Sequence, residues 1–291
     1  MSKTFLLALI LLLLLPHIAC RQYRSLQTSF LNTNDELESS YRDLIEERNM
    51  EYIEQHNRGS STFKMAPNQF LSLTHEEFKA TMGSPLDFSH QPETLPTLSA
   101  TIPLTTNIII DWWKAGMVTP AKDQGYYCGC CYAFATASDI ESSYLIKYGK
   151  LYDLSEQQIV DCSGSFGNSG CLSGFYFYSL KYVMYNPLNL EQDYGYIGSV
   201  STCKAKWQNS VGITSYFGYN GTSCSILENA LKTRPVLASV DGLNIYWMFY
   251  SSGILSNCGT PNTLNHAVHV VGLYSYANGT SYYVVKNSWS R

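Results

Sequence analysis

The segment QGYYCGCCYAFATASDI, residues 124–140, contains three cysteines immediately before a helical pattern. From Ala133 to Ile146, apolar side chains recur at three- and four-residue steps, which predicts a helix with one buried side. Cys131 stands at the N-terminal end of that helix. Aligned peptide dipoles and unpaired N–H groups at a helix start favour an anion, so a thiolate is stabilised there. The segment therefore predicts a reactive cysteine at residue 131.

A reactive thiolate needs a partner base and a group that orients the base. The sequence offers His266, within LNHAV at the start of a predicted strand, and Asn287, within KNSW after another predicted strand. Gln124 lies just before the cysteines and could supply a side-chain N–H to an oxyanion. These four residue types together point to nucleophilic catalysis by Cys131.

Two other interpretations involve metal or redox chemistry. Cys128 and Cys131 form a C-x-x-C pair, which can bind zinc or cycle as a disulfide. Neither a second pair nor a βαβ pattern accompanies it, which argues against both uses. His266 and His269 could form a metal pair, but on a strand these two side chains face opposite sides. We therefore expect no metal and no organic cofactor.

The chain changes character near residue 100. Residues 35–57 carry many charges with apolar residues at helical spacing, which predicts an amphipathic helix. Residues 68–78 predict a short strand and a turn that lead into a second helix, with Thr74 as its N-cap. Residues 83–106 contain four prolines and almost no periodicity, which predicts an extended linker.

Beyond the linker, the predicted helices precede the predicted strands. Residues 155–161 predict a second short helix that begins with a capping box. Segments rich in Val and Tyr and bounded by Gly, Asn and Pro predict strands at residues 235–241, 265–274 and 281–286. Helices first and strands later favour an α+β fold over a βαβ sheet.

The N-terminal residues 1–20 predict a signal peptide. Lys3 precedes an apolar run over residues 5–15, which is shorter than the about 20 residues of a transmembrane helix. No other apolar run is long enough, so we expect no stable membrane span; an uncleaved anchor is the alternative for residues 1–20. Export places the remaining chain in a lumenal or extracellular compartment, where disulfides persist.

Charge and cysteine content fit that compartment. The net charge is −4 and no Lys/Arg cluster occurs, which argues against nucleic acid as a partner. Nine cysteines are present, and two glycosylation sequons begin at Asn220 and Asn278. We therefore expect a disulfide-bonded glycoprotein.

Several motifs, in order along the chain, resemble the papain family of cysteine proteases. The segment QGYYCGCCYAF resembles its active-site segment, and NHAV and KNSW resemble its histidine and asparagine segments. LSEQQIVDC at residues 154–162 and SGCLSG at residues 169–174 follow the same order. The spaced pattern of the cathepsin L-type inhibitory propeptide is matched by Glu38, Arg42, Ile45, Asn49, Ile53 and Asn57.

The resemblance implies an α+β papain-like fold of two subdomains, a helical half and a β-barrel-like half, with the active site in the cleft. It divides the chain into a signal peptide (1–20), a helical inhibitory propeptide and linker (25–103), and a peptidase domain (104–291). The expected protein is an endopeptidase made as an inactive precursor. Its partners would be protein or peptide substrates and its own propeptide, and its location lysosomal, endosomal or secreted.

The resemblance also assigns roles to individual residues. Cys131 would be the nucleophile, His266 its general base and acid, and Asn287 the group that orients the imidazole. Gln124 and the Cys131 backbone N–H would form the oxyanion hole. The acyl-enzyme intermediate would be a thioester on Cys131. The implied substrate-binding residues are Gly174, Phe175, Ser239, Leu264, Asn265 and Trp289. The implied disulfides are Cys128–Cys171 and Cys162–Cys203.

Some positions depart from the family pattern. One extra residue lies between Gln124 and Cys131, and Cys130 replaces the usual Ser or Ala. The chain ends at Arg291, where the family continues with a Gly-rich segment and further strands, so we expect a truncated and poorly folded peptidase. Cys224 and Cys258 are left over, and either pair with each other or stay free. The alternative functions are a catalytically inactive homologue or fragment with a binding or structural role, and a propeptide-type protease inhibitor.

Overall fold

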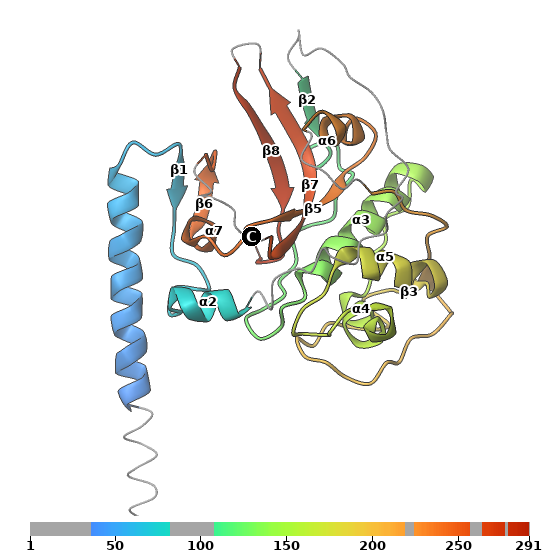
Figure 1. Ribbon diagram of the computed structural model, residues 1–291, viewed down its shortest axis with the longest axis horizontal. Coiled ribbons are helices and arrows are strands. Elements are labelled where there is room, and N and C mark those ends of the chain that lie inside the picture. The colour runs from blue at the N-terminus through green and yellow to red at the C-terminus, as the bar shows by residue number, and fades with distance from the viewer. Residues whose placement is uncertain (1–35, 82–107, 219–223, 257–263, 277–278, 291) are drawn as a thin grey trace, which may run out of the picture. The chain divides into compact units, whose positions relative to one another are not determined.

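The computed structural model describes residues 36–81, 108–218, 224–256, 264–276 and 279–290 (Figure 1). The predicted signal peptide, the whole predicted linker, the asparagines of both sequons and Cys258 lie outside these residues. The chain separates into two compact units. One contains the residues up to Ser61 together with Ala66–Thr74, and the other contains Thr62–Met65 together with His75–Arg291.

The first unit is organised around a helix over residues 36–58, close to the predicted 35–57. Asn49 is buried, and its side-chain amide donates to the backbone oxygens of Leu71 and Leu73 at 2.7 and 2.9 Å. Arg42 donates to the Ser72 oxygen at 3.1 Å. One side of the helix thereby holds the turn over residues 68–74 through side-chain hydrogen bonds.

In the second unit, the helical half is built on α3 (Cys131–Tyr148), α4 (Glu156–Cys162) and α5 (Tyr176–Tyr185). Helix α3 packs against strand β7 (His266–Ser275) as well as against α4 and α5 (Figure 1). Contact on several sides explains why α3 is buried continuously from its first residue to Ser142. The Ser155 hydroxyl accepts the Gln158 N–H at 3.0 Å and caps α4, but the Ser155 N–H donates to the Asn189 oxygen, so only one of the two bonds of the predicted capping box forms.

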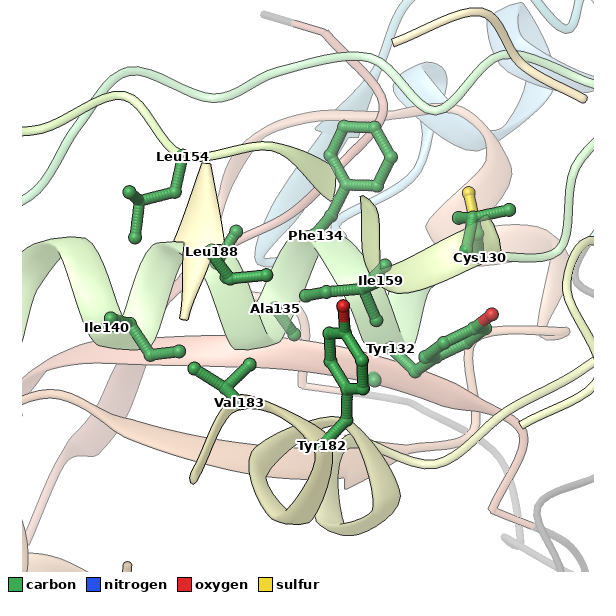
Figure 2. Close-up of a cluster of buried hydrophobic side chains, with 14 of the residues drawn as sticks. Cys130, Tyr132, Phe134, Ala135, Ile140, Leu154, Ile159, Tyr182, Val183 and Leu188 are labelled. Carbon is green, nitrogen blue, oxygen red and sulfur yellow. The ribbon is translucent and has the colours of Figure 1, made fainter. Parts of the chain in front are cut away.

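The core of this half surrounds α3 (Figure 2). Apolar side chains from α3, α4, α5 and the short strand β3 (Leu188–Asn189) meet there, with almost no exposed surface. The labelled members in Figure 2 are Cys130, Tyr132, Phe134, Ala135, Ile140, Leu154, Ile159, Tyr182, Val183 and Leu188. Burial of this much apolar surface fixes the position of the α3 N-terminus.

The other half contains an antiparallel sheet of four strands. Strand β7 pairs with β2 (Ile108–Asp111), β5 (Val236–Val240) and β8 (Ser281–Lys286). All ten β7 residues are buried, as expected for a strand with neighbours on both edges and α3 on one face. The described strands form an open sheet, so the β-barrel-like half that the resemblance implies is observed as an unclosed sheet.

Smaller elements complete the second unit. Strand β1 (Phe63–Met65) pairs with β6 (Tyr250–Gly253) in antiparallel register. The remaining elements are α2 (His75–Thr81), η1 (Gly164–Phe166), β4 (Ser210–Val211), α6 (Cys224–Leu231) and α7 (Ile245–Met248). The prediction of a strand within residues 68–78 is wrong: residues 68–74 form turns that lead into α2, and the strand is β1, ahead of them. Side-chain bonds from Asn49 hold this stretch as a turn.

Three carboxylates surround the Lys122 ammonium in the second unit. The Lys122 ammonium lies 2.6 Å from Asp153, 2.7 Å from Glu156 and 3.4 Å from Glu141. The side chains of Glu141 and Glu156 are 0% and 2% exposed. Burial opposes the charge on Lys122, but Glu156 and Glu141 outweigh it and raise the pKa of Lys122 far above its usual range. Lys122 is therefore the counter-ion of this cluster, although burial still raises the pKa of Glu156 to about 8.

Replacing Lys122 by Ala should lower the free energy of unfolding by about 3–5 kcal/mol, because breaking a buried ion pair leaves its partners uncompensated. Urea denaturation followed by circular dichroism measures this loss. The control is Lys150→Ala, at an exposed position of the same charge, which should change stability by no more than about 0.5 kcal/mol. Equal effects of the two substitutions would show that Lys122 does not stabilise the fold through these pairs.

Candidate active site

Cys131 is the first residue of α3, and only 2% of its surface is exposed. Its Sγ accepts a hydrogen bond from the backbone N–H of Ala267 at 3.3 Å. The α3 N-terminus and the β7 start therefore meet at this sulfur. Burial raises the pKa of the Cys131 thiol to about 11, although hydrogen bonds from backbone N–H groups act in the opposite direction.

His266 is the first residue of β7 and the chain neighbour of Ala267. Its Nε2 lies 2.8 Å from the Asn287 Oδ1. Because an amide oxygen only accepts, Nε2 carries the ring hydrogen and Nδ1 holds the lone pair. Nδ1 is buried and makes no hydrogen bond within the described residues. Burial lowers the pKa of His266 to about 4, and the bond to Asn287 only partly offsets this.

Trp289 covers the His266–Asn287 pair. Its ring stacks on the imidazole, with 4.6 Å between ring centroids and 28° between planes. The Phe78 ring of α2 packs edge-on against Trp289 at 5.5 Å, and the Trp247 ring of α7 at 6.4 Å. These aromatic rings exclude water from the imidazole and so strengthen its hydrogen bond to Asn287.

Gln124 joins the loop before α3 to the chain after β8. Its backbone N–H donates to the Ser288 carbonyl at 2.9 Å, and its Oε1 accepts the Ser288 hydroxyl at 2.6 Å. Its Nε2 donates one hydrogen to the Cys128 carbonyl at 3.1 Å. An amide nitrogen carries two hydrogens, so one donor of Gln124 is left for a ligand.

Three of the expected substrate-binding residues are placed by their backbone and neighbours. Ser239 pairs with Ala267 across β5 and β7, which places it beside the active centre. Gly174 faces Tyr132 so closely that a Cβ at this position would lie 2.5 Å from the ring. Asn265 accepts the Gly242 N–H at 2.9 Å and donates to Asp241 at 2.8 Å. Asn265 thus anchors the chain just before His266.

The two remaining candidates differ in exposure. Phe175 is 4% exposed and packs its ring against Tyr176 at 4.4 Å, so it belongs largely to the interior. Leu264 is 37% exposed and lies two residues before His266. Only Leu264 of this pair presents an apolar side chain to solvent.

The structure contains the disulfides Cys128–Cys171 and Cys162–Cys203, the pairs that the resemblance implies. Because Cys128 is bonded to Cys171, the C-x-x-C alternative for Cys128 and Cys131 is wrong. Cys130 and Cys131 are free and buried, whereas Cys224 is free and exposed. Of the two alternatives for Cys224, the structure therefore shows the free thiol, while Cys258 lies outside the described residues.

Gly242 is a residue that sequence reasoning missed. A Cβ on it would lie 2.6 Å from the His266 Cβ and 2.9 Å from its Cγ. Only a glycine lets the turn after β5 pass this close to the imidazole. The available signal was a glycine just after a predicted strand, which indicates a turn but does not reveal what the turn contacts.

Metal-binding groups and membrane-spanning helices are both absent from the part of the chain that the structure describes. The described residues contain no group of three or more His, Cys, Asp or Glu side chains arranged to hold a metal ion. Among the described helices, none has the length and apolar character needed to cross a membrane.

Comparison with known proteins identifies two domains. Residues 107–291 match the model for the papain family cysteine protease, and residues 22–78 match the cathepsin propeptide inhibitor domain. The chain is 35% identical to digestive cysteine proteinase 2 of Homarus americanus, over 88% of this chain and 81% of the relative. It is 34% identical to procathepsin L of Felis catus, over 87% and 78%.

Solved structures of precursors agree with these matches. Digestive procathepsin L 3 of Tenebrio molitor larval midgut superposes with a TM-score of 0.77 at 31% identity, covering 87% of this chain and 83% of that one. The recombinant stem bromelain precursor gives a TM-score of 0.75 at 32% identity, covering 87% and 81%. The papain-like fold predicted from the sequence is thereby confirmed. The chain belongs to the papain family of cysteine proteases and carries a cathepsin-type propeptide inhibitor domain ahead of the protease domain.

Proposed function

We propose that the endopeptidase activity of this chain runs through Cys131 as nucleophile and His266 as general base. The observation that carries this proposal is the meeting of the α3 start and the β7 start at the Cys131 sulfur. The bond from His266 Nε2 to Asn287 leaves the unprotonated Nδ1 without another partner among the described residues. This lone pair makes no hydrogen bond to the Cys131 sulfur, which accepts the Ala267 N–H instead, so the imidazole would have to approach the thiol when it acts as its base.

In the proposed reaction, His266 Nδ1 takes the proton of the Cys131 thiol. The thiolate then attacks the carbonyl carbon of the scissile peptide bond, and the carbonyl oxygen becomes an oxyanion. The second Nε2 hydrogen of Gln124 and the Cys131 backbone N–H, at the helix start, would donate to that oxygen.

His266 next gives its proton to the departing amine, which leaves an acyl group on Cys131. Water, deprotonated by His266, hydrolyses this thioester and restores the thiol. Asn287 keeps the imidazole in the productive orientation throughout. Backbone groups of Gly174 and Asn265 would hold an extended peptide, with Ser239, Phe175 and Leu264 bordering a pocket for an apolar side chain.

We further propose that the precursor is latent because its reactive pair is kept neutral. A thiol with a pKa near 11 beside an imidazole with a pKa near 4 contains very little thiolate at neutral pH. Parts of the matched propeptide domain contact the protease domain directly. Strand β1 pairs with β6, and Phe78 of α2 packs on Trp289. Removing these segments would admit water to the pair and relieve its desolvation.

The proposed organisation assigns residues 1–20 to a signal peptide, 25–103 to the propeptide and linker, and 104–291 to the peptidase. We place the processing site between residues 83 and 110, before the core of the protease domain. The names of the relatives, procathepsin L and digestive cysteine proteinase, support a lysosomal, endosomal or secreted location.

The identity of the nucleophile can be tested with an epoxide-type thiol inhibitor after acid activation. The adduct should map to Cys131 in the unmodified protein and persist in Cys130→Ala, but disappear in Cys131→Ala. Peptide mass spectrometry locates the label, and turnover of a fluorogenic dipeptide is followed in parallel. A label on Cys130, or a well-folded chain with no thiol-dependent turnover, would favour the inactive homologue instead.

The ionisation of Cys131 predicts a pH dependence for the intact precursor. Because only the thiolate reacts, alkylation of Cys131 by iodoacetamide should accelerate about tenfold per pH unit and level off near pH 11. After maturation, the rate should be higher at pH 6 and depend little on pH between about 5 and 8. Identical profiles for precursor and mature protein would refute latency by a neutral pair.

The close approach of Gly242 to His266 predicts a specific effect of a small substitution. Gly242→Ala should lower kcat/KM by at least about tenfold, since the added methyl group would displace the His266 imidazole. Gly195→Ala is the control, because a Cβ there has no neighbour closer than 3.6 Å. Full activity in Gly242→Ala, with an unchanged melting temperature, would show that the imidazole position is not set by this contact.

A further inference from the structure

The Tyr196 hydroxyl lies between the two segments to which the proposed function assigns the chemistry. Its oxygen lies 2.7 Å from the backbone oxygen of Gln124 and 3.1 Å from the Sγ of Cys130. Gln124 would donate to the oxyanion, and Cys130 directly precedes Cys131. Figure 2 shows Cys130 at one end of the buried cluster around α3.

Only one assignment of donors and acceptors satisfies both hydrogen bonds of the Tyr196 hydroxyl. A carbonyl oxygen only accepts, so the Tyr196 hydroxyl donates its single hydrogen to Gln124. The Cys130 thiol must then donate to the Tyr196 oxygen. Burial keeps both groups protonated, since it raises the pKa of Cys130 and the pKa of Tyr196 above their usual ranges. The result is a chain of hydrogen bonds from Cys130 through Tyr196 to Gln124.

Tyr196 is itself held in place on several sides. Its backbone N–H donates to Glu191 at 2.7 Å, and the following N–H of Ile197 donates to Gln157 at 2.9 Å. Its ring packs edge-on against Phe134 of α3, with centroids 4.9 Å apart. A hydroxyl on so constrained a ring can fix the position of the group that it contacts.

We propose that Tyr196 and Cys130 are positioning residues that set the oxyanion hole by fixing the backbone of Gln124 relative to the start of α3. This inference rests on the proposed function. Compared with the papain-family pattern, the loop from Gln124 to Cys131 has one extra residue. We infer that side-chain hydrogen bonds are needed to hold the two ends of this longer loop at a fixed distance. Ser288 holds Gln124 from the sheet side, and Tyr196 holds it from the helical side.

A displaced Gln124 would weaken a bond that forms only when the oxyanion develops. Such a loss lowers kcat and leaves KM nearly unchanged. Direct alkylation of Cys131 by iodoacetamide forms no oxyanion and should not be affected. The two reactions therefore separate a role in the oxyanion hole from a general disturbance of the thiol and imidazole.

The test uses the full chain, matured by acid treatment, with Tyr196→Phe, which keeps the ring and removes only the hydroxyl. We expect kcat for a fluorogenic peptide to fall about tenfold, a fraction of the 10²–10³ that follows loss of an oxyanion donor. KM and the alkylation rate of Cys131 should change less than about twofold, while a peptide aldehyde, which forms a tetrahedral adduct, should bind about tenfold more weakly.

Two further variants complete the design. Cys130→Ala breaks the same chain of hydrogen bonds and should lower kcat in the same direction, whereas Cys130→Ser should restore it, because a hydroxyl also donates. Tyr182→Phe is the matched control: it removes another buried hydroxyl of the helical half, one that accepts from Gln158 at 3.0 Å. We expect Tyr182→Phe to leave kcat unchanged.

If the unmodified enzyme is active and kcat is unchanged in both Tyr196→Phe and Cys130→Ala, the inference is overturned and the proposed function stands. Equal losses in hydrolysis and alkylation would also overturn it, because they indicate a general disturbance. If Tyr196→Phe does not fold, Cys130→Ala and Cys130→Ser decide the question. Absence of thiol-dependent turnover in the unmodified enzyme would instead contradict the proposed function, and with it this inference.

Discussion

The packing of α3 against β7 is the constraint on which the active centre depends. It brings the first residue of a helix and the first residues of a strand to one sulfur atom, where the Ala267 N–H meets Cys131. Neither element could supply this arrangement alone. The helix provides an N-terminus that favours an anion, while the strand provides the imidazole and a backbone donor. The apolar core around α3 fixes both.

The same burial that builds the centre also suppresses its charge. Removing a thiolate or an imidazolium from water costs free energy, so Cys131 and His266 both shift toward their neutral forms. Around Lys122, direct pairing with Glu141 and Glu156 offsets part of the cost of burying charge. Cys131 and His266 have no such counter-ion among their described contacts. The proposed latency thus ascribes the inactive and the active form to two solvation states of one geometry.

Local patterns predicted most of the elements, because a regular period of apolar residues or a capping box acts over a few residues. The helices at α3 and α4 and the strands at β5, β7 and β8 therefore lie close to their predicted bounds. The strand expected within residues 68–78 failed for a non-local reason. Hydrogen bonds from Asn49, about twenty residues earlier in the chain, hold that stretch as a turn.

The sequence by itself determined the family, the order of helices and strands, and the residue types that could carry the chemistry, since motifs and periodicity are written in neighbouring residues. Only the tertiary structure decided which imidazole nitrogen is free, how closely Gly242 approaches His266, and that Tyr196 bridges Cys130 to Gln124. These facts depend on contacts between residues far apart in the chain. Their distances and burial are set by packing, which no local pattern encodes.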